Sequence, residues 1–310
     1  LRHPSQSSLE ILSRTPTLSQ FVRYEMDKAP AEERCFLRES HLISSELEKG
    51  GSHRSVFVSP NLNASLMINE EDHLRLSTLV AGSSLPKAYD RLQTLEAELE
   101  RGVELAFSDE HGYLTACPTN TGTGLRLSML MHLPALAILE QIDLTLADLP
   151  GYGLTVRGAY GENSANLGDL YQISNEVTLG RTEEELMQVL ERIVRQVIER
   201  EMIARERLMR DWSGKLEDLV CRAVGTLASA RRMDSKEAIA LLSRLRLGIG
   251  QDWGFGLSHP ALSRLFVSIQ PGHLQCSRKG ADEPLDRDQE RAALLRSIFG
   301  GRGPNDAEKN

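Results

Sequence analysis

Residues 113–134, YLTACPTNTGTGLRLSMLMHLP, indicate how this chain is organised. A strand-like run over 113–117 breaks at Pro118 and enters a loop that holds Asn120 and two glycines, residue types that tolerate unusual backbone angles. An apolar run with one cation, Arg126, follows. This combination suits a phosphorylated ligand, because loop amides and hydroxyls donate to phosphate oxygens. The simpler alternative is a structural turn between buried strands.

Composition narrows the classes of function. With 310 residues the chain can bury one large core or two smaller ones, and a net charge of −8 gives no support for nucleic-acid binding. The four cysteines form no CxxC pair, which favours neither a zinc site nor a disulfide framework. We find no signal peptide and no apolar run of membrane-spanning length, so we expect a cytoplasmic protein that does not bind membranes.

Hydrophobic patterning predicts helices and strands in mixed order. Two capping boxes, Thr182-x-x-Glu185 and Asp234-x-x-Glu237, mark helix starts. The expected helices cover 18–26, 31–39, 77–106, 133–149, a long segment from 182, 216–227, 236–245 and 261–267. The expected strands cover 41–44, 55–58, 64–68, 104–108, 113–117, 154–157, 170–175 and 177–180.

Two further segments carry carboxylates at strand ends. NEEDHLR runs from Asn69 to Arg75, and RGAYGE runs from Arg157 to Glu162. Each can be a solvated loop.

These segments resemble one known family. CPTNTGTGLR, NEEDHLR and RGAYGE are similar, in the same order, to the signatures of ATP:guanido phosphotransferases, which include arginine and creatine kinases. The chain looks most like their bacterial branch, the protein-arginine kinases. The resemblance implies an α+β fold, with a mainly antiparallel sheet flanked by helices and then a C-terminal helical domain. We expect a catalytic domain over 1–204, a helical regulatory or dimerisation domain over 205–299, and a disordered tail over 300–310.

The resemblance also implies roles for individual residues. It implies that Glu71 and Glu162 are catalytic, because a guanidinium is always protonated and needs carboxylates that orient it and accept its proton. It also implies that Cys117 assists substrate binding, although a buried structural thiol is an equal alternative. His41 on its own would be interpreted as a surface or cap histidine. The resemblance implies instead that it lies beside the nucleotide. The implied ATP-binding residues are His41, Arg75, Arg126, Leu127, Ser128, Met129, Leu130, Arg157, Gly158, Ala159, Tyr160, Gly161 and Glu162.

The implied reaction moves the γ-phosphoryl group of Mg-ATP to arginine side chains of proteins, which marks them for degradation. Mg²⁺ comes with ATP, and no metal site of the protein's own is expected. The implied partners are arginine-containing protein substrates, an activator protein, a Clp-type protease and a second copy of the chain. Two alternatives stay open: a kinase of free arginine or another small guanidino compound, and a non-catalytic phosphoarginine-binding adaptor.

A second site is expected near the C-terminus. The segment Arg287–Ala292 reads as an ordinary helix start, with acids in its first turn and charges facing water. Its arginines, Arg287 and Arg291, are four residues apart and share a helix face. The segment resembles the motif with which bacterial protein-arginine kinases sense phosphoarginine. The implied allosteric residues are Arg287, Asp288, Gln289, Glu290, Arg291 and Ala292.

One family segment has no counterpart here. Family members begin with an S-x-R-x-R-x-x-R-N strand that holds ATP phosphates, and Ser13-Arg14-Thr15 does not replace it. We expect this strand upstream of Leu1 if the sequence is truncated. If the strand is truly lost, ATP affinity should be poor, because two or three charge-assisted contacts are missing.

Overall fold

The computed structural model describes residues 15–159, 166–251, 253, 256–277 and 284–300. The chain forms two compact units. Unit 1 comprises Leu1–Met129, Leu149–Thr155 and Ile173–Ile193, and unit 2 comprises Leu130–Asp148, Val156–Gln172 and Val194–Asn310. No helix in the described ranges is both long and apolar enough to span a membrane.

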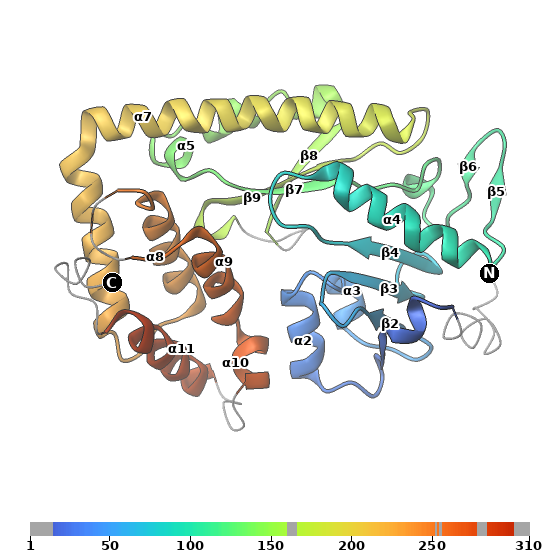
Figure 1. Ribbon diagram of the computed structural model, residues 1–310, viewed down its shortest axis with the longest axis horizontal. Helices are drawn as coiled ribbons and strands as arrows, with labels where there is room; N and C mark the ends of the chain where they lie inside the picture. Colours follow the sequence, from blue (N-terminus) through green and yellow to red (C-terminus); the bar gives the residue numbers. More distant parts are fainter. Residues whose placement is uncertain (1–14, 160–165, 252, 254–255, 278–283, 301–310) are drawn as a thin grey trace. The chain divides into compact units, whose positions relative to one another are not determined.

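Unit 1 is built on an antiparallel sheet with the strand order β1-β2-β3-β4 (Figure 1). The two central strands, β2 (Ser55–Val58) and β3 (Ala64–Ile68), are buried throughout and have the predicted bounds. The outer strands are β1 (Val22–Glu25) and β4 (Leu74–Thr78). Arg75 on β4 pairs with Met67 on β3, which fixes the sheet face on which its side chain lies.

Alternate residues of the central strands pack on opposite faces, as strand geometry requires. Val56, Val58 and Met67 share a core with residues of the helices α2 (Ala31–Glu39) and α3 (Ser45–Glu48). Phe57, Leu66 and Ile68 pack instead with Leu99 of α4 (Leu85–Glu100). The sheet of unit 1 therefore has helices on both faces.

Two expectations near the start of the chain are wrong. The expected helix over 18–26 is a short 3-10 helix, η1 (Leu18–Gln20), followed by β1, because pairing with β2 outweighs local helix propensity. The expected strand over 41–44 is a turn that leads into α3. Ser44 caps this helix by accepting a hydrogen bond from the Leu47 amide at 3.1 Å.

The remaining strands are β5 (Phe107–Ser108) and β6 (Gly112–Tyr113), which form a hairpin, and β7 (Ser128–His132), β8 (Leu154–Gly158) and β9 (Leu170–Asn175), which form a sheet in the order β7-β9-β8. The hairpin strands are shorter than the expected 104–108 and 113–117, β8 is one residue longer than the expected 154–157, β9 has the expected bounds, and β7 was not expected. Residues 177–180, expected as a strand, lie outside the regular elements. Short 3-10 turns, η2 (Pro118–Asn120) and η4 (Leu167–Asp169), precede β7 and β9.

The helix expected over 133–149 is broken. It consists of α5 (Pro134–Ile138), α6 (Ile142–Leu146) and the 3-10 turn η3 (Leu149–Tyr152). Glu140 lies between the first two with φ +55°, a left-handed conformation that cannot continue an α-helix. Apolar periodicity over 133–149 did not reveal this interruption.

Both predicted helix starts are confirmed, and the first has the complete capping box. Thr182 and Glu185 exchange reciprocal side-chain-to-amide hydrogen bonds of 3.2 and 2.9 Å at the start of α7 (Glu183–Ser229). Asp234 accepts from the Glu237 amide at 2.8 Å at the start of α8 (Ser235–Leu247). The helix expected over 216–227 is the last part of α7 and not a separate helix. Within α7 only Trp212 has non-helical backbone angles (φ −132°, ψ 21°).

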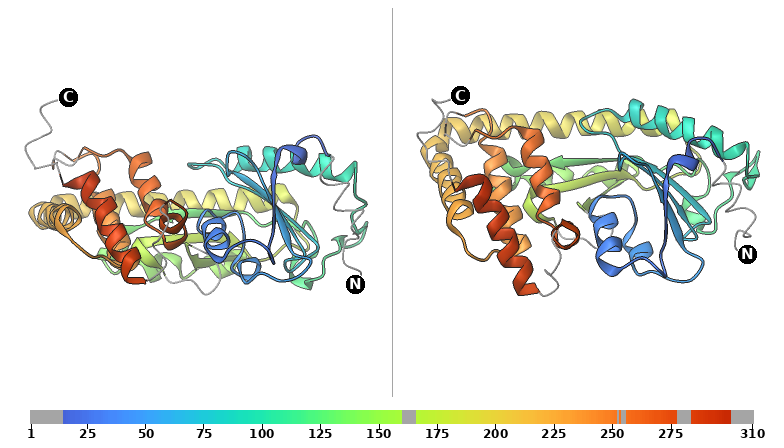
Figure 2. Two further views of the ribbon diagram at one scale, coloured as in Figure 1. Left: turned by 90° about the horizontal axis from the view of Figure 1, so that it is seen from below. Right: turned by 60° about the horizontal axis from the view of Figure 1, so that its bottom comes forward.

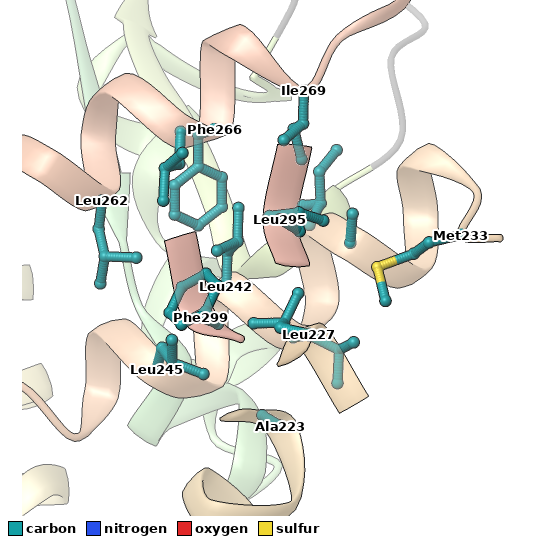
Figure 3. Close-up of a cluster of buried hydrophobic side chains, with 14 of the residues drawn as sticks. Ala223, Leu227, Met233, Leu242, Leu245, Leu262, Phe266, Ile269, Leu295 and Phe299 are labelled. Atoms are coloured by element: carbon teal, nitrogen blue, oxygen red, sulfur yellow. The ribbon is translucent and has the colours of Figure 1, made fainter. Parts of the chain in front are cut away.

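The core of unit 2 lies among helices. The second half of α7 packs with α8, α9 (His259–Ser268) and α11 (Pro284–Phe299), and α10 (Pro271–Ser277) contacts α9 and α11 (Figures 1 and 2). Leu227, Leu242, Phe266, Leu295 and Phe299 meet at its centre (Figure 3). The predicted α+β class with a helical C-terminal region is confirmed. The expected disordered tail falls mostly on 301–310, outside the described residues.

Candidate active site

The loop between β3 and β4 carries the three acids of NEEDHLR, and each has a different environment. Glu70 is turned inward, with only 4% of its side chain exposed. It accepts hydrogen bonds from the Ser44 hydroxyl and, at 3.2 Å, from Arg75. Burial by itself raises the pKa of Glu70, but Arg75 and the hydrogen bonds from Ser44 and the Glu71 amide outweigh it, so the pKa lies below its usual value. Glu70 therefore orients Arg75.

Asp72 joins this loop to the segment that opens the sequence. Its Oδ1 accepts from the backbone amides of Ala116 at 2.6 Å and Cys117 at 3.0 Å. Its Oδ2 accepts from the Asn120 side-chain amide at 2.7 Å. One carboxylate thus holds both ends of the Cys117 turn against the loop that bears Glu71.

Glu71 lies between these two anchored acids, and its side chain is exposed. Its Oε2 is 3.5 Å from the Asn120 side-chain nitrogen, which also binds Asp72. An exposed carboxylate on an anchored backbone can approach a cationic substrate and accept a proton from it. This is the geometry that the role predicted for Glu71 requires.

Cys117 is half-buried beside the same acids. Its Sγ lies 3.0 Å from the Thr119 hydroxyl. The structure therefore brings together two of the three predicted catalytic residues, Glu71 and Cys117. The third, Glu162, lies outside the described residues, as do Tyr160 and Gly161.

The Gly/Thr loop is held in place from behind. The Thr178 hydroxyl lies within hydrogen-bond distance of the carbonyl oxygens of Thr119 (3.0 Å) and Thr121 (2.8 Å). Gly122 has φ +117°, and a Cβ at this position would lie 2.4 Å from the Thr178 carbonyl oxygen. Only glycine fits a backbone approach this close, so Gly122 is needed for packing as well as for the turn.

Asn175 sets the direction of the segment that carries Arg126. This buried side chain accepts from the Leu127 amide at 2.7 Å and donates to the carbonyl oxygens of Leu125 at 3.0 Å and Val177 at 3.2 Å. Leu125 and Leu127 face the core, and Arg126 is exposed between them. Alternation continues, with Ser128 and Leu130 exposed and Met129 half-buried.

Of the predicted nucleotide-binding residues, Arg75, Arg126 and His41 belong to unit 1. His41 follows α2 with φ +58°, and its pKa is lowered by burial and then by the charge of Arg38. Arg157 and Gly158 end β8 in unit 2 and Ala159 follows them, and Gly158 and Ala159 are buried. Among the described residues, no group of three or more His, Cys, Asp or Glu side chains could hold a metal ion.

The predicted phosphoarginine segment begins α11, and Arg291 has an environment that the sequence did not indicate. Its side chain is 1% exposed and donates to the carbonyl oxygens of Ile269 and Met233, both at 2.8 Å, and to Asp288 at 2.7 Å. Ala292 is also buried. Arg291 therefore stabilises the helical core, and the role of the segment as a phosphoarginine site stays a prediction.

Sequence reasoning assigned no role to Glu70, Asp72, Asn120, Asn175 or Thr178. For two of these residues the sequence contained a signal that could have identified them. Asp72 is the third acid of a run in which a single acid would suffice as a proton acceptor. Asn175 is an amide at the end of an otherwise apolar strand, and buried amides need several partners.

Comparison with known proteins agrees with this geometry. Residues 6–204 match the family model described as ATP:guanido phosphotransferase, C-terminal catalytic domain. The chain belongs to the ATP:guanido phosphotransferase family. Within the family, residues 213–310 match the model described as the protein-arginine kinase McsB C-terminal domain.

Relatives in the same family include two bacterial proteins named protein-arginine kinase. The one from Geobacillus sp. (strain WCH70) is 42% identical over 281 residues, which is 91% of this chain and 78% of the relative. The one from Bacillus subtilis (strain 168) is 41% identical over 281 residues, 91% of this chain and 77% of the relative.

Solved structures in this family share the fold. The duplicated taurocyamine kinase from Schistosoma mansoni superposes with a TM-score of 0.56 and 26% identity, over 74% of this chain and 34% of that chain. Lombricine kinase gives a TM-score of 0.53 and 25% identity, over 63% of this chain and 57% of that chain. Both matches span less than two thirds of the solved chain, so we take only the fold from them.

Proposed function

We propose that the chain is a protein-arginine kinase that transfers the γ-phosphoryl group of Mg-ATP to arginine side chains of proteins. The relatives with this name and the match of 213–310 to their C-terminal domain support the substrate class. The observation that carries the chemistry is the anchoring of the exposed Glu71 beside Cys117 through Asp72.

In this proposal a nitrogen of the substrate guanidinium attacks the γ-phosphorus. The N–P bond forms as the bond between the γ-phosphorus and the bridging oxygen breaks, and ADP leaves. Glu71 orients the guanidinium and accepts its proton, with Glu162 as the second carboxylate. Phosphoryl transfer depends chiefly on positioning and charge stabilisation, and bound Mg²⁺ supplies part of that charge.

The donor set of unit 1 fits a polyphosphate. Arg75 is oriented by Glu70, with its own side chain 41% exposed, and Arg126 is held outward by Asn175. Guanidinium groups match phosphate oxygens in charge and in fork geometry. His41 of unit 1 and Arg157 of unit 2 are further members of the proposed nucleotide-binding set, and Mg²⁺ would be bound through the phosphates.

The test is incubation with ATP and an arginine-rich protein, followed by detection of acid-labile phosphate on arginine. Free L-arginine, offered separately, tests the alternative of a small-molecule kinase. Glu71→Gln keeps the shape but not the charge, and should lower the rate roughly 10²–10⁴-fold. Because Glu71 is exposed, the melting temperature should not change. Equal rates in the parent and the variant would refute the role of Glu71.

Further parts of the proposal concern the setting of the reaction. An activator protein, a Clp-type protease, a homodimer and a cytoplasmic location were all expected from the sequence. They remain predictions. Phosphoarginine binding at Arg287 and Asp288 belongs with them, and free phosphoarginine should change the activity of the parent but not of Asp288→Ala.

A further inference from the structure

Four basic side chains from four elements of unit 2 gather near the end of β7. They are His132 of β7, Arg205 of α7, Arg246 of α8 and His259, the first residue of α9. Burial and then the charges of Arg246, Arg205 and His259 lower the pKa of His132 well below its usual value. Burial, Arg246 and Arg205 likewise lower the pKa of His259. Neither the reaction nor the predicted phosphoarginine segment uses this basic cluster.

Hydrogen bonds fix the imidazole of His132. Its Nε2 lies 2.9 Å from the hydroxyl of Ser243, which in turn donates to Asp169 at 2.5 Å. Because Ser243 gives its proton to Asp169, it accepts from Nε2–H, and the neutral ring then carries its lone pair on Nδ1. This Nδ1 is buried and has no hydrogen-bond partner among the described residues. A buried nitrogen of this kind requires an explanation.

Arg246 also has no counter-ion among the residues that the structure describes. It lies three residues after Ser243, on the same face of α8. In the described part of the chain its side chain makes no hydrogen bond and no ion pair, and its pKa is lowered by burial and then by Arg205. A partly buried guanidinium without an anion is unfavourable.

The nearby carboxylates are already engaged. Glu201 is 5% exposed and accepts from the amides of Ala135 (3.1 Å) and Leu136 (3.0 Å) in the first turn of α5, and from Arg205 at 2.6 Å. Asp169 is engaged by Ser243. Neither carboxylate is among the groups that shift the pKa of His132, His259 or Arg246. The charges that shift these three pKa values are therefore those of Arg205, Arg246 and His259.

Solvent reaches one side of the cluster. The Arg205 side chain is 31% exposed, and His259 is an exposed residue. We propose that Arg205, Arg246 and His259 bind a small tetrahedral oxyanion, such as inorganic phosphate, with His132 behind it. Two guanidinium groups supply forked donors for such an ion, and the imidazoles supply further donors once they are protonated.

Binding at this site takes up protons. An anion removes the repulsion that disfavours the imidazolium forms of His132 and His259, so it raises their pKa values and binds more tightly as the pH falls. The bound anion also contacts residues of α7, α8, α9 and the end of β7 at the same time. Phosphate should therefore stabilise unit 2, and the gain in stability should rise with the logarithm of its concentration above Kd.

The test is a calorimetric titration of the full chain with sulfate, whose charge stays constant between about pH 6 and pH 8. Arg246→Gln should weaken binding roughly tenfold or more, because a charge-assisted contact is lost. Arg244→Gln, an exposed position on the same helix, is the matched control and should bind like the parent. Equal affinity in the parent and Arg246→Gln, or an equal loss in Arg244→Gln, would overturn the proposal.

A second variant covers the case in which Arg246→Gln fails to fold. His259→Asn changes an exposed side chain and should fold normally, but it should weaken the pH dependence of sulfate binding. The C2 proton of His259 should shift during titration of the parent, which separates this site from anions bound near Arg75 and Arg126. An unchanged His259 resonance at saturating sulfate would also overturn the proposal. Parallel titrations with inorganic phosphate and O-phosphoserine distinguish a site for the free ion from one for a phosphoryl group on a larger molecule.

Discussion

Replacing Asp72 by asparagine should slow phosphoryl transfer while leaving the fold intact. The carboxylate accepts three hydrogen bonds, at 2.6 and 3.0 Å from backbone amides and at 2.7 Å from Asn120. In Asp72→Asn one oxygen remains for the two amides, but the new NH₂ group faces the Asn120 donor. One bond is lost and two lose their charge assistance.

The magnitude follows from typical hydrogen-bond energies. A bond to a charged group contributes roughly 1.5–3 kcal/mol and a neutral one roughly 0.5–1.5 kcal/mol, so losing one charged bond and the charge assistance of two others weakens the anchoring of the turn by about 3.5–6 kcal/mol. This loss is local, because Asp72 anchors a turn and contributes nothing to the apolar clusters of unit 1. Displacement of catalytic groups by about 1 Å can cost about 10²-fold in rate. We expect kcat to fall about 10- to 100-fold.

The assay is the initial rate of arginine phosphorylation over a range of ATP and protein substrate concentrations, with the melting temperature measured in parallel. Asp109→Asn, an exposed position next to the β5–β6 hairpin, makes the same chemical change and should behave like the parent. Parent-like kcat in Asp72→Asn would refute the argument that Asp72 positions the Cys117 turn. A loss of activity only in proportion to unfolded protein would also refute it.

Three further substitutions test the packing arguments. Arg291→Met leaves two buried carbonyl oxygens without donors and should lower the free energy of unfolding by roughly 3–5 kcal/mol in denaturant titrations, whereas the exposed Gln289→Met should change it little. Gly122→Ala should reduce both stability and kinase rate, and should do so more than Gly180→Ala, because both glycines have positive φ but only Gly122 meets a backbone atom. Glu70 has a lowered pKa, so its contribution to stability is present above the ordinary carboxyl pKa and is lost as the pH falls through the folded value. Unfolding measured between about pH 6 and pH 3 should therefore show a shallower loss of stability for Glu70→Gln than for the parent.

The sequence was sufficient for those features that local patterns determine. The strands 55–58 and 64–68 are recognisable because continuous apolar runs are bounded by a turn, and both capping boxes are local hydrogen-bond patterns. The family and the fold class predicted from three signatures are confirmed. Local patterns failed where pairing with a distant segment determines the secondary structure. An example is β1, which is a strand because it pairs with β2.

The candidate site shows the same limit. Glu71 and Cys117 could be selected from their motifs, but the hydrogen bonds that join them run between residues 44 to 45 positions apart in the chain. Arg291 is a clearer case, because its charge and spacing suggested a ligand and its burial shows a structural role. Residue type and spacing identify which groups are available, but only the tertiary contacts show how each group is used.

Asn175 has a consequence for folding as well as for the site. A strand that slips by one residue relative to its neighbour moves every side chain to the opposite face. Such a slip in the segment before β7 would bury Arg126 and expose Leu125 and Leu127. Asn175 binds the carbonyl of Leu125 and the amide of Leu127, two positions on one face, and a slipped chain cannot satisfy both. This one amide therefore favours the register in which the arginine faces outward, and it does so without any ligand.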